Sequence, residues 1–350
     1  MNIIVCDNKY TLFPFSINHA SFEMKIGMFT NLDRIQMLCD DNDKIYLEVN
    51  PEIEEIIKEK YPKYTINTQS LPEGMKLIGS SPYKKLKQDF KDLSGWGDVL
   101  KLNKEFLFYD FEIYECTQNY IKHDSVILIN NQFIKINNGS NLKAGVIIDA
   151  EDGPVVLGKN VLVDVGAIIK GPVFIDDNSY VAPGAKIRSG TSIGKNCKVG
   201  GEISNSIILD YSNKVHDGFL GHSFIGEWVN IGAGTNNSNL KNNYSTVKFN
   251  YGDSRGLVDT KEQFLGAFIG DYTKLGISTM LNAGTHIGIG ANVFGGNFQD
   301  KYILPFSWGK DDKVDFNKFV ETCRKMKLRR NIKISKIEVD FLKYIYDKIN

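Results

Sequence analysis

The sequence predicts a parallel β-helix that follows a small α/β domain and precedes C-terminal helices. The main observation is a six-residue repeat, because every sixth residue from Leu157 to Val199 is Leu, Ile or Val. A second run with the same period extends from Ile269 to Val293. Helices and ordinary strands have side-chain periods of about 3.6 and 2, so this period indicates a solenoid in which each hexapeptide forms one flat face. Stacked coils would bury a continuous apolar column, to which each aliphatic side chain contributes about 1.5–3 kcal/mol.

The composition sets the broad class of the protein. The 350 residues are enough for two domains of ordinary size. Lys plus Arg and Asp plus Glu both number 42, which gives no general reason to expect nucleic acid or an anionic membrane as a partner. The five cysteines are scattered without a CxxC pair, which argues against a disulfide framework and a zinc knuckle. The N-terminal apolar run is too short for a signal peptide and no run reaches membrane-spanning length, so we expect a cytoplasmic protein.

Residues 1–110 predict the small α/β domain. Strands are expected at residues 2–6, 45–48, 64–67 and 75–77, and helices at 31–39 and 51–61. A loop that wraps nucleotide phosphates needs glycines, because backbone N–H groups must approach the phosphate without a side chain in the way. The first glycine of the chain is Gly27, so such a loop does not follow the first strand.

Residues 111–145 are expected to form a connecting segment. The runs Val126–Ile129 and Phe133–Ile136 predict a hairpin that is closed by Asn130, Asn131 and Gln132. The β-helix is expected over 146–300, with a loop insertion at 235–265 where the repeat is interrupted. Insertions in solenoids form loops on one face, which is where such proteins usually bind ligands.

The C-terminal residues 301–350 predict two helices that cap the open end of the solenoid. The first, over 315–330, is amphipathic with a basic end, and the second begins at a capping box formed by Ser335 and Glu338.

The repeat loses phase between Gly200 and Gly218 and is expected to resume at Phe219. Within and beyond this break lie motifs that resemble the bifunctional N-acetylglucosamine-1-phosphate uridylyltransferase/glucosamine-1-phosphate acetyltransferase family. The closest resemblance is to its branch of sugar nucleotidyltransferase-like proteins with a divergent N-terminal domain. The motifs are Lys198–Glu202, Asn213–His222, Gly226–Tyr244 and Gly270–Met280. The resemblance covers the chain in order and is most specific from 150 to 310.

This resemblance implies a left-handed β-helix and a homotrimer whose acetyltransferase sites lie between coils of neighbouring subunits. It places His216 on the family's catalytic histidine. The residues that it assigns to sugar phosphate or acetyl-CoA are Arg188, Asn230, Ala233, Asn237, Asn239, Tyr244 and Lys248. Phe219 replaces a family tyrosine, and Ser204 stands where the family has a lysine for the sugar phosphate. These departures concern the acceptor sugar.

The chemistry of acetyl transfer to an amine suits this region. A histidine with a near-neutral pKa can take the ammonium proton, so His216 is assigned as the general base, with Asp217 or a loop asparagine orienting the ring. Backbone N–H groups of residues 232–234 can stabilise the oxyanion. The alternative is that His216 and His222 are surface residues of the solenoid, and that the asparagines of 236–243 are polar loop residues. A metal site of His216, His222 and His286 is not expected, because no carboxylate or cysteine cluster completes it.

The N-terminal domain carries a second hypothesis, nucleotidyl transfer from a nucleoside triphosphate to a sugar-1-phosphate. Such a reaction needs cations on the phosphates and carboxylates for Mg²⁺. Candidate nucleotide-binding residues are Lys9, Lys25 and Asp98, with Arg34, Asp7 and Asp110 as further candidates. The glycine-rich loop is missing and His19-Ala20 stands where the branch has Arg-Pro, so a degenerate domain is expected. A third hypothesis is a non-catalytic assembly protein. The sequence thus predicts a transferase of nucleotide-sugar biosynthesis, an acyltransferase that uses acetyl-CoA.

Overall fold

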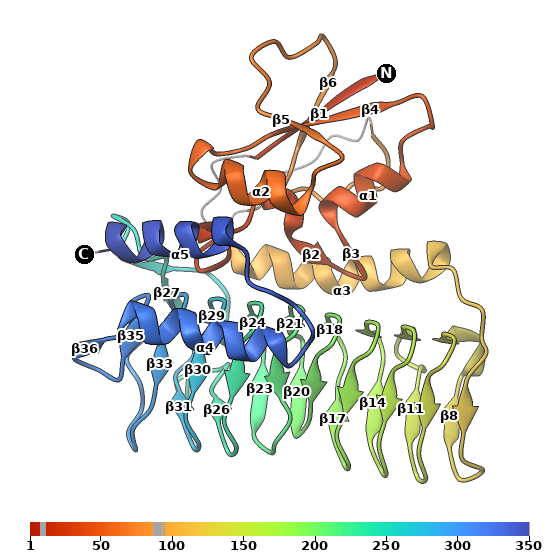
Figure 1. Cartoon of the computed structure of the whole chain (residues 1–350). Coiled ribbons are helices and arrows are strands. Elements are labelled where there is room, and N and C mark those ends of the chain that lie inside the picture. The colour runs from red at the N-terminus through yellow and green to blue at the C-terminus, as the bar shows by residue number, and fades with distance from the viewer. Residues whose placement is uncertain (8–11, 87–92, 94, 350) are drawn as a thin grey trace.

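The computed structural model describes residues 1–7, 12–86, 93 and 95–349 (Figure 1). An N-terminal α/β part lies above a long β-helix, the helix α3 (Trp96–Ile113) runs between them, and two C-terminal helices lie against the side of the β-helix. No helix among these residues combines the length and apolar character that crossing a membrane requires.

The N-terminal part is built on a parallel four-stranded sheet with the order β5-β4-β1-β6. Its strands are β1 (Asn2–Cys6), β4 (Lys44–Glu48), β5 (Thr65–Ile66) and β6 (Met75–Ile78), accompanied by α1 (Asn31–Met37), α2 (Glu54–Lys60) and the short ribbon of β2 (Lys25–Ile26) and β3 (Phe29–Thr30). Single 3₁₀ turns occur at η1 (Phe15–Ile17), η2 (Ser21–Glu23), η3 (Pro51–Ile53) and, in the β-helix, η4 (Asn131–Phe133). The strands and helices expected in this part are confirmed within a few residues, whereas α3 was not predicted.

The rest of the chain forms a left-handed β-helix with three faces of parallel strands. Face 1 contains β7 (Ile121–Lys122), β10 (Asn141–Leu142), β13 (Leu162–Val163), β16 (Tyr180–Val181), β19 (Lys198–Val199), β22 (Asn213–Lys214), β25 (Asn230–Ile231), β30 (Lys274–Leu275), β33 (Asn292–Val293), β35 (Ser307–Trp308) and the antiparallel β36 (Asp312–Lys313). Face 2 contains β8 (Ile127–Ile129), β11 (Ile147–Asp149), β14 (Ile168–Lys170), β17 (Lys186–Ile187), β20 (Glu202–Ser204), β23 (Phe219–Gly221), β26 (Asn236–Asn237) and β31 (Met280–Leu281). Face 3 contains β9 (Ile134–Ile136), β12 (Val155–Leu157), β15 (Val173–Ile175), β18 (Thr191–Ile193), β21 (Ile207–Ile208), β24 (Phe224–Ile225), β29 (Ala267–Ile269), β32 (Thr285–Ile287) and β34 (Tyr302–Ile303).

The six-residue repeat marks the interior of this β-helix. Every aliphatic of the run from Leu157 to Val199 has no exposed surface, and the second run from Ile269 to Val293 is likewise buried. Phe219 does not return to this column as predicted. It is half-buried on the outside, while Leu220 points inward with 3% of its surface exposed.

The loss of phase reflects one short coil. Regular coils advance 18 residues, from Leu162 to Tyr180 and from Tyr180 to Lys198. The next coil advances only 15 residues, from Lys198 to Asn213. Much of the loss falls at Gly200-Gly201, which alone link β19 to β20. Any side chain at Gly200 would collide with the backbone of Val215, so the short turn requires glycine there.

The hairpin predicted in 111–145 is wrong. Its two runs, β8 and β9, lie on different faces and pair in parallel with β11 and β12 of the next coil. The first coil already begins at Ile121, because β7 pairs with β10. Asn130 adopts a left-handed conformation (φ 59°) at the corner between β8 and β9, a conformation that asparagine tolerates in solenoid corners as well as in hairpins.

The C-terminal helices also lie elsewhere than predicted. α4 (Phe316–Leu328) and α5 (Lys336–Lys348) pack along the corner between faces 3 and 1, over Trp228, Tyr272 and Phe306, instead of capping the end (Figure 1). The capping box is confirmed, since Ser335 Oγ accepts a hydrogen bond from the N–H of Glu338 at 2.9 Å.

The N-terminal part docks along face 3. Trp96 stacks between Phe224 and Phe268, with ring centroids 4.6 and 4.7 Å away. Asn103 of α3 is fully buried and its amide donates to Gly190 O at 2.9 Å. Because one apolar cluster contains residues of the N-terminal part, α3 and face 3, the division of the chain into separate domains stays a prediction.

A ladder of aspartates extends this docking to the corner between faces 3 and 1. Asp177, Asp210 and Asp271 each accept, through Oδ1, the backbone N–H of a residue on the preceding coil. Lys25 forms a buried ion pair of 2.6 Å with Asp176, which lies beside the ladder, and His19 contacts Asp271 at 2.9 Å. The sequence gave no sign of these contacts, which join residues more than 150 positions apart.

Candidate functional site

His216 lies in the corner turn between β22 on face 1 and β23 on face 2. The turns stacked on either side of it are glycine-rich, Gly200-Gly201 on one coil and Gly232–Thr235 on the next. Gly234 donates its N–H to Asp217 O at 3.0 Å, which joins two of these turns directly. The motif around His216 is thus flanked on both sides by backbone with small side chains.

The imidazole of His216 is exposed and, within the described part of the chain, has no hydrogen-bond partner. Asp217 is also exposed, and no hydrogen bond between described residues joins its carboxylate to the His216 ring. The ring nitrogens are therefore free to contact a substrate, whereas the orienting role expected for Asp217 stays a prediction.

Lys214 occupies an interior position of the β-helix that an aliphatic residue fills in neighbouring coils. It pairs in register with Val199, has 3% of its surface exposed, and donates through Nζ to the backbone oxygen of His216 at 2.5 Å. Burial lowers the pKa of Lys214 to about 8, and the nearby carboxylate of Asp217 opposes this shift. Sequence analysis missed this residue. Its signal was the lysine at the position where the six-residue repeat breaks.

The turn at 232–235 contains a candidate oxyanion donor. Gly232 and Gly234 already donate their N–H groups to Leu275 O and Asp217 O, both at 3.0 Å. The N–H of Ala233 makes no hydrogen bond to any described residue. Of the three amides expected to stabilise an oxyanion, Ala233 is therefore the one that is available.

Arg188 reaches the same side of the molecule from face 2. It follows Ile187, which pairs with Ile203, and its guanidinium forms a 2.7 Å ion pair with Glu202. Glu202 in turn lies in register with Phe219, just after the His216 turn. The structure thus brings Arg188 to within one coil of His216, on a face where both Arg188 and Phe219 are accessible.

The asparagines differ in their environment. Asn230 is exposed on face 1, one coil from the His216 turn. Asn237 is 5% exposed, and its amide bonds the backbone N–H and C=O of Gly221 at 2.9 and 3.0 Å, so its side chain serves the fold. Asn239 contacts His222 Nδ1 at 2.8 Å. Asn236, which accepts from Phe219 N at 2.7 Å, lies closest to the His216 turn.

Tyr244 and Lys248 belong to the insertion, which folds away from His216. Lys248 lies on β27 (Lys248–Asn250), which forms an antiparallel ribbon with β28 (Leu257–Asp259). Phe249 of this ribbon packs on Phe268 of face 3, with a centroid distance of 5.1 Å. Within one chain, Lys248 and the exposed Tyr244 are therefore not gathered with His216. The histidines are also dispersed, because His222 stacks on Phe264 and His286 on Phe249.

No protein-family model matches the chain. Among curated proteins, it is similar to the bifunctional sugar-1-phosphate nucleotidylyltransferase/acetyltransferase of Sulfurisphaera tokodaii, with 33% identity over 156 residues that cover 42% of this chain and 38% of that protein. The bifunctional protein GlmU of Wigglesworthia glossinidia brevipalpis is 32% identical over 191 residues, covering 53% of this chain and 35% of that protein. The chain is a relative of these bifunctional proteins. The resemblance inferred from the motifs is confirmed, although the chain spans less than two fifths of the length of either relative.

Two solved structures are also similar, the UDP-N-acetylglucosamine acyltransferases of Francisella novicida and Arabidopsis. Their TM-scores are 0.36 and 0.30, each at 14% identity. The comparisons cover 65% of this chain and 78% of the first protein, and 56% of this chain and 72% of the second. TM-scores this low do not establish a common fold.

The residues expected to bind a nucleotide, as the printed names of these relatives suggest, are not gathered. Lys25 is consumed by its buried ion pair with Asp176, and Arg34 is paired with Asp110 in the core. Asp98 lies in the first turn of α3, and Lys9 lies outside the described residues. A cavity of about 1000 Å³ does open at the carboxyl ends of β1 and β4, lined by Asp7, Glu48 and Asn50 among others. This is the edge of a parallel sheet at which ligands usually bind.

Proposed function

We propose that the protein is an acetyl-CoA-dependent N-acetyltransferase that acts on an amino-sugar phosphate in nucleotide-sugar biosynthesis in the cytoplasm. The observation that carries the proposal is the unpartnered, exposed imidazole of His216 between two glycine-rich turns, in a chain related to bifunctional acetyltransferases. A free imidazole that titrates near neutrality suits a general base.

In the proposed reaction, the imidazole of His216 accepts a proton from the acceptor's amino group while the nitrogen attacks the thioester carbonyl carbon. The N–H of Ala233 donates to the oxyanion that develops, because it is the unused amide of the adjacent turn. The tetrahedral intermediate then collapses, the C–S bond breaks, and the coenzyme A sulfur leaves with the proton that His216 had accepted. Arg188 and Asn230 lie on the two faces that meet at this corner, where they would bind sugar phosphate and acetyl-CoA.

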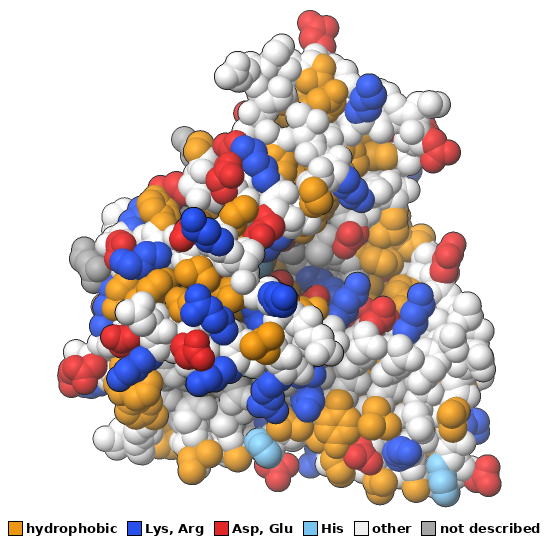
Figure 2. All heavy atoms as spheres, in the orientation of Figure 1, with side chains coloured by type: hydrophobic (Ala, Val, Ile, Leu, Met, Phe, Trp, Pro, Cys, Tyr) orange, Lys and Arg blue, Asp and Glu red, His pale blue; other side chains and the backbone are white. Residues whose placement is uncertain are grey.

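The proposal includes a homotrimer, because a single chain provides only one wall of the site. The corner between faces 1 and 2 that carries His216 also carries Val165, Ile277 and Phe294, whose exposed fractions are 53, 76 and 46%. A row of exposed apolar side chains on one edge is typical of a surface that other subunits cover. Figure 2 shows apolar side chains gathered along the β-helix on the side away from the N-terminal part. In a trimer, Tyr244 and Lys248 of a neighbouring subunit would complete the site.

The direct test compares His216→Ala with the wild type in an assay of free coenzyme A thiol released in the presence of a panel of amino-sugar phosphates. His123→Ala is the matched control, because His123 is an exposed histidine on the first coil. We expect the His216 variant to lose at least about 100-fold in rate and to keep its melting temperature. Transfer at the wild-type rate in a folded His216→Ala variant would refute the assignment.

The subunit arrangement has its own test. Sedimentation equilibrium should give a trimer for the wild type and a smaller species for Ile277→Asp, which places a charge in the apolar row. Acetyl transfer should fall in parallel. A monomeric wild type with full activity would exclude a site shared between subunits.

A second candidate function is nucleotidyl transfer, favoured by the cavity at the carboxyl ends of β1 and β4. Among described residues, the one group of three potential metal ligands whose donor atoms lie within 4.8 Å of one another contains none of Asp7, Asp98 and Asp110, so these carboxylates do not form a preassembled Mg²⁺ site. Pyrophosphate release from nucleoside triphosphates with sugar-1-phosphates tests this candidate. A protein that shows neither activity and binds neither coenzyme A nor nucleotide would be the non-catalytic assembly protein.

A further inference from the structure

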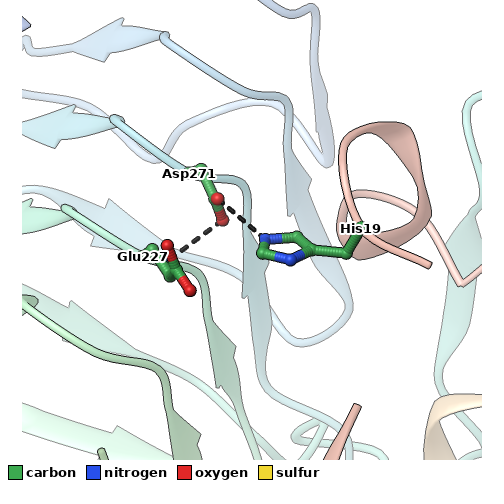
Figure 3. Close-up of side chains that lie close together, drawn as sticks. All are labelled: His19, Glu227 and Asp271. Carbon is green, nitrogen blue, oxygen red and sulfur yellow. Dashed lines mark hydrogen bonds and ion pairs between the residues drawn. The ribbon is translucent and has the colours of Figure 1, made fainter. Parts of the chain in front are cut away.

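A histidine and two carboxylates meet where the N-terminal part contacts the β-helix (Figure 3). His19 precedes η2, while Glu227 and Asp271 come from corner turns of adjacent coils between faces 3 and 1. One potential ligand atom from each residue lies within 4.8 Å of the other two. His19 Nε2 lies 2.9 Å from Asp271 Oδ2. Two donors around one first-row metal ion are separated by about this distance when each metal–ligand bond is about 2.0–2.2 Å.

The surrounding residues hold these groups in place. The His19 ring stacks on Phe15, with centroids 4.7 Å apart and an angle of 3° between the planes. Its other nitrogen, Nδ1, faces the carboxylate of Glu23 at 3.6 Å. A histidine that binds a metal usually directs its second ring nitrogen toward a carboxylate or carbonyl, which fixes the tautomer and the ring orientation. Asp271 is fixed as well, because its Oδ1 accepts the N–H of Glu227 at 2.9 Å.

A separate observation is an oxygen without a partner. Asn18 is 9% exposed and donates its amide to Asp271 Oδ2 at 2.8 Å, yet its Oδ1 is buried without a hydrogen-bond partner in the described structure. Asn18, Glu227 and Asp271 line one cavity of about 260 Å³. Buried amide oxygens are nearly always hydrogen-bonded or bound to an ion, so this orphan indicates an absent partner.

The formal charges point to a cation. Three carboxylates, those of Glu23, Glu227 and Asp271, face His19 and Lys60. Lys60 is bound to Glu23 at 3.0 Å, on the side of His19 away from Asp271. Glu227 has no hydrogen bond from its carboxylate to any described side chain, and it also lines a larger cavity of about 720 Å³. Figure 2 shows the surface hollowed between the N-terminal part and the β-helix, with charged side chains at the rim. An ion could reach the cluster through these cavities.

We propose that His19, Glu227 and Asp271 bind one divalent transition-metal ion, with the amide oxygen of Asn18 as a further donor. One imidazole with carboxylate and amide oxygens suits Zn²⁺ and, with lower affinity, Mn²⁺ rather than the all-oxygen preference of Mg²⁺. The ion joins the N-terminal part to two coils of the β-helix, so its binding stabilises their docking. This site is separate from the His216 turn and does not depend on the proposed acetyltransferase function.

The test uses the full chain without an affinity tag, stripped with a chelator and titrated calorimetrically with ZnCl₂, MnCl₂ or MgCl₂. We expect about one equivalent of Zn²⁺ to bind, more weakly Mn²⁺, and no Mg²⁺ at the same concentrations. Bound Zn²⁺ should raise the melting temperature by mass action. Glu227→Gln, which keeps the side-chain shape, should lower the Zn²⁺ affinity by about 100-fold. Asp177→Asn, at the equivalent ladder position on another coil, should leave it unchanged.

Two results would overturn the proposal. One is an absence of stoichiometric Zn²⁺ binding by the folded wild type, which would identify the cluster as an ion-pair network only. The other is Zn²⁺ binding that His19→Gln and Glu227→Gln leave unaltered, which would place the ion elsewhere. If either variant unfolds, X-ray absorption of the Zn²⁺-loaded wild type decides instead, because one nitrogen with several oxygens supports the site and sulfur ligation refutes it.

Discussion

The side-chain nitrogen of Lys214 lies 2.5 Å from the backbone oxygen of His216, inside the β-helix. This bond fixes the turn that carries the proposed general base from within the core, because Lys214 takes the place of an interior aliphatic residue. A cation in an apolar column is unfavourable unless it is bound to an acceptor. Lys214 is therefore the residue through which stability and function are coupled at this corner.

The first prediction concerns the pH dependence of stability. Burial lowers the pKa of Lys214 to about 8, below its ordinary value of 10.5, so the unfolded chain holds this proton more tightly than the folded chain. The free energy of unfolding of the wild type should consequently rise with pH between about 8 and 10.5, relative to Lys214→Met, with a limiting slope of about 1.4 kcal/mol per pH unit. Urea unfolding of both proteins at several pH values measures this difference.

The same variant should affect activity. Without the bond from Lys214, the His216 turn loses its anchor, and we expect acetyl transfer to fall by about tenfold or more. Lys274→Met is the control, since burial also lowers the pKa of Lys274 to about 8 but this lysine contacts Trp228 and Tyr272 near α4. It should share the pH-dependent stability and leave transfer intact. Equal activities of the two variants would show that Lys214 does not position His216.

The second prediction uses a pair of glycines with the same backbone conformation. Gly201 and Gly184 both have φ of +66°, but a Cβ at Gly201 would lie 2.9 Å from His216 O and from Lys214 Nζ, while a Cβ at Gly184 has nothing within 4 Å. Gly184→Ala should cost about 1–2 kcal/mol of unfolding free energy through left-handed strain alone. Gly201→Ala should cost about 1–3 kcal/mol more and also reduce acetyl transfer, because it displaces the His216 turn.

Chemical denaturation and the thiol-release assay on both alanine variants provide the measurement. If the two variants lose the same stability and the same activity, the contact between Gly201 and the His216 turn has no energetic role.

The sequence predicted the features of this molecule that depend on local periodicity. The aliphatics from Leu157 to Val199 all point inward, because a buried column repeats once per flat face. The break in the repeat was visible, but not its cause, a coil shortened at Gly200-Gly201. For the same reason Phe219 was wrongly placed in the column, since the shorter coil shifts the interior position to Leu220.

Contacts between distant segments could not be predicted in this way. The hairpin expected at residues 126–136 has the same alternation and turn residues as a solenoid corner, and only pairing with β11 and β12 distinguishes them. His19 and Lys25 carried no local sign that they would meet Asp271 and Asp176. The candidate site divides similarly: the motif located His216, whereas Lys214 and the committed side chain of Asn237 became evident only from packing.

The third prediction tests the docking of the N-terminal part. Asn103 Oδ1 accepts from Gly27 N at 2.8 Å and from Ser192 Oγ at 2.9 Å, in addition to the amide's bond to Gly190. Asn103→Ala leaves these buried groups without partners and should lower the unfolding free energy by about 2–4 kcal/mol. Lys104→Ala, at the exposed neighbouring position on α3, should change it by less than about 0.5 kcal/mol. Differential scanning calorimetry of both would contradict the docking role if their melting temperatures match.

The last prediction isolates the proposed oxyanion donor. Ala233 is the second residue of a turn in which Gly234 has φ of +70° and Thr235 donates back to Gly232 O at 3.3 Å. Proline is favoured at this turn position, and Pro183 occupies it in an earlier coil, where Gly184 has φ of +66°. Ala233→Pro should therefore fold normally while it removes the one unused N–H of the turn.

We expect Ala233→Pro to lower kcat for acetyl transfer by about 10²–10³, the usual effect of losing one oxyanion donor, with little change in melting temperature. Pro183→Ala, the reverse exchange at the equivalent turn, controls for altered backbone stiffness and should leave kcat unchanged. Because proline lacks only the donor and fits the turn, a loss of kcat without a loss of stability assigns the N–H of Ala233 to the transition state. A fully active Ala233→Pro variant would move the oxyanion donor to a side chain such as Asn230 or to the neighbouring subunit.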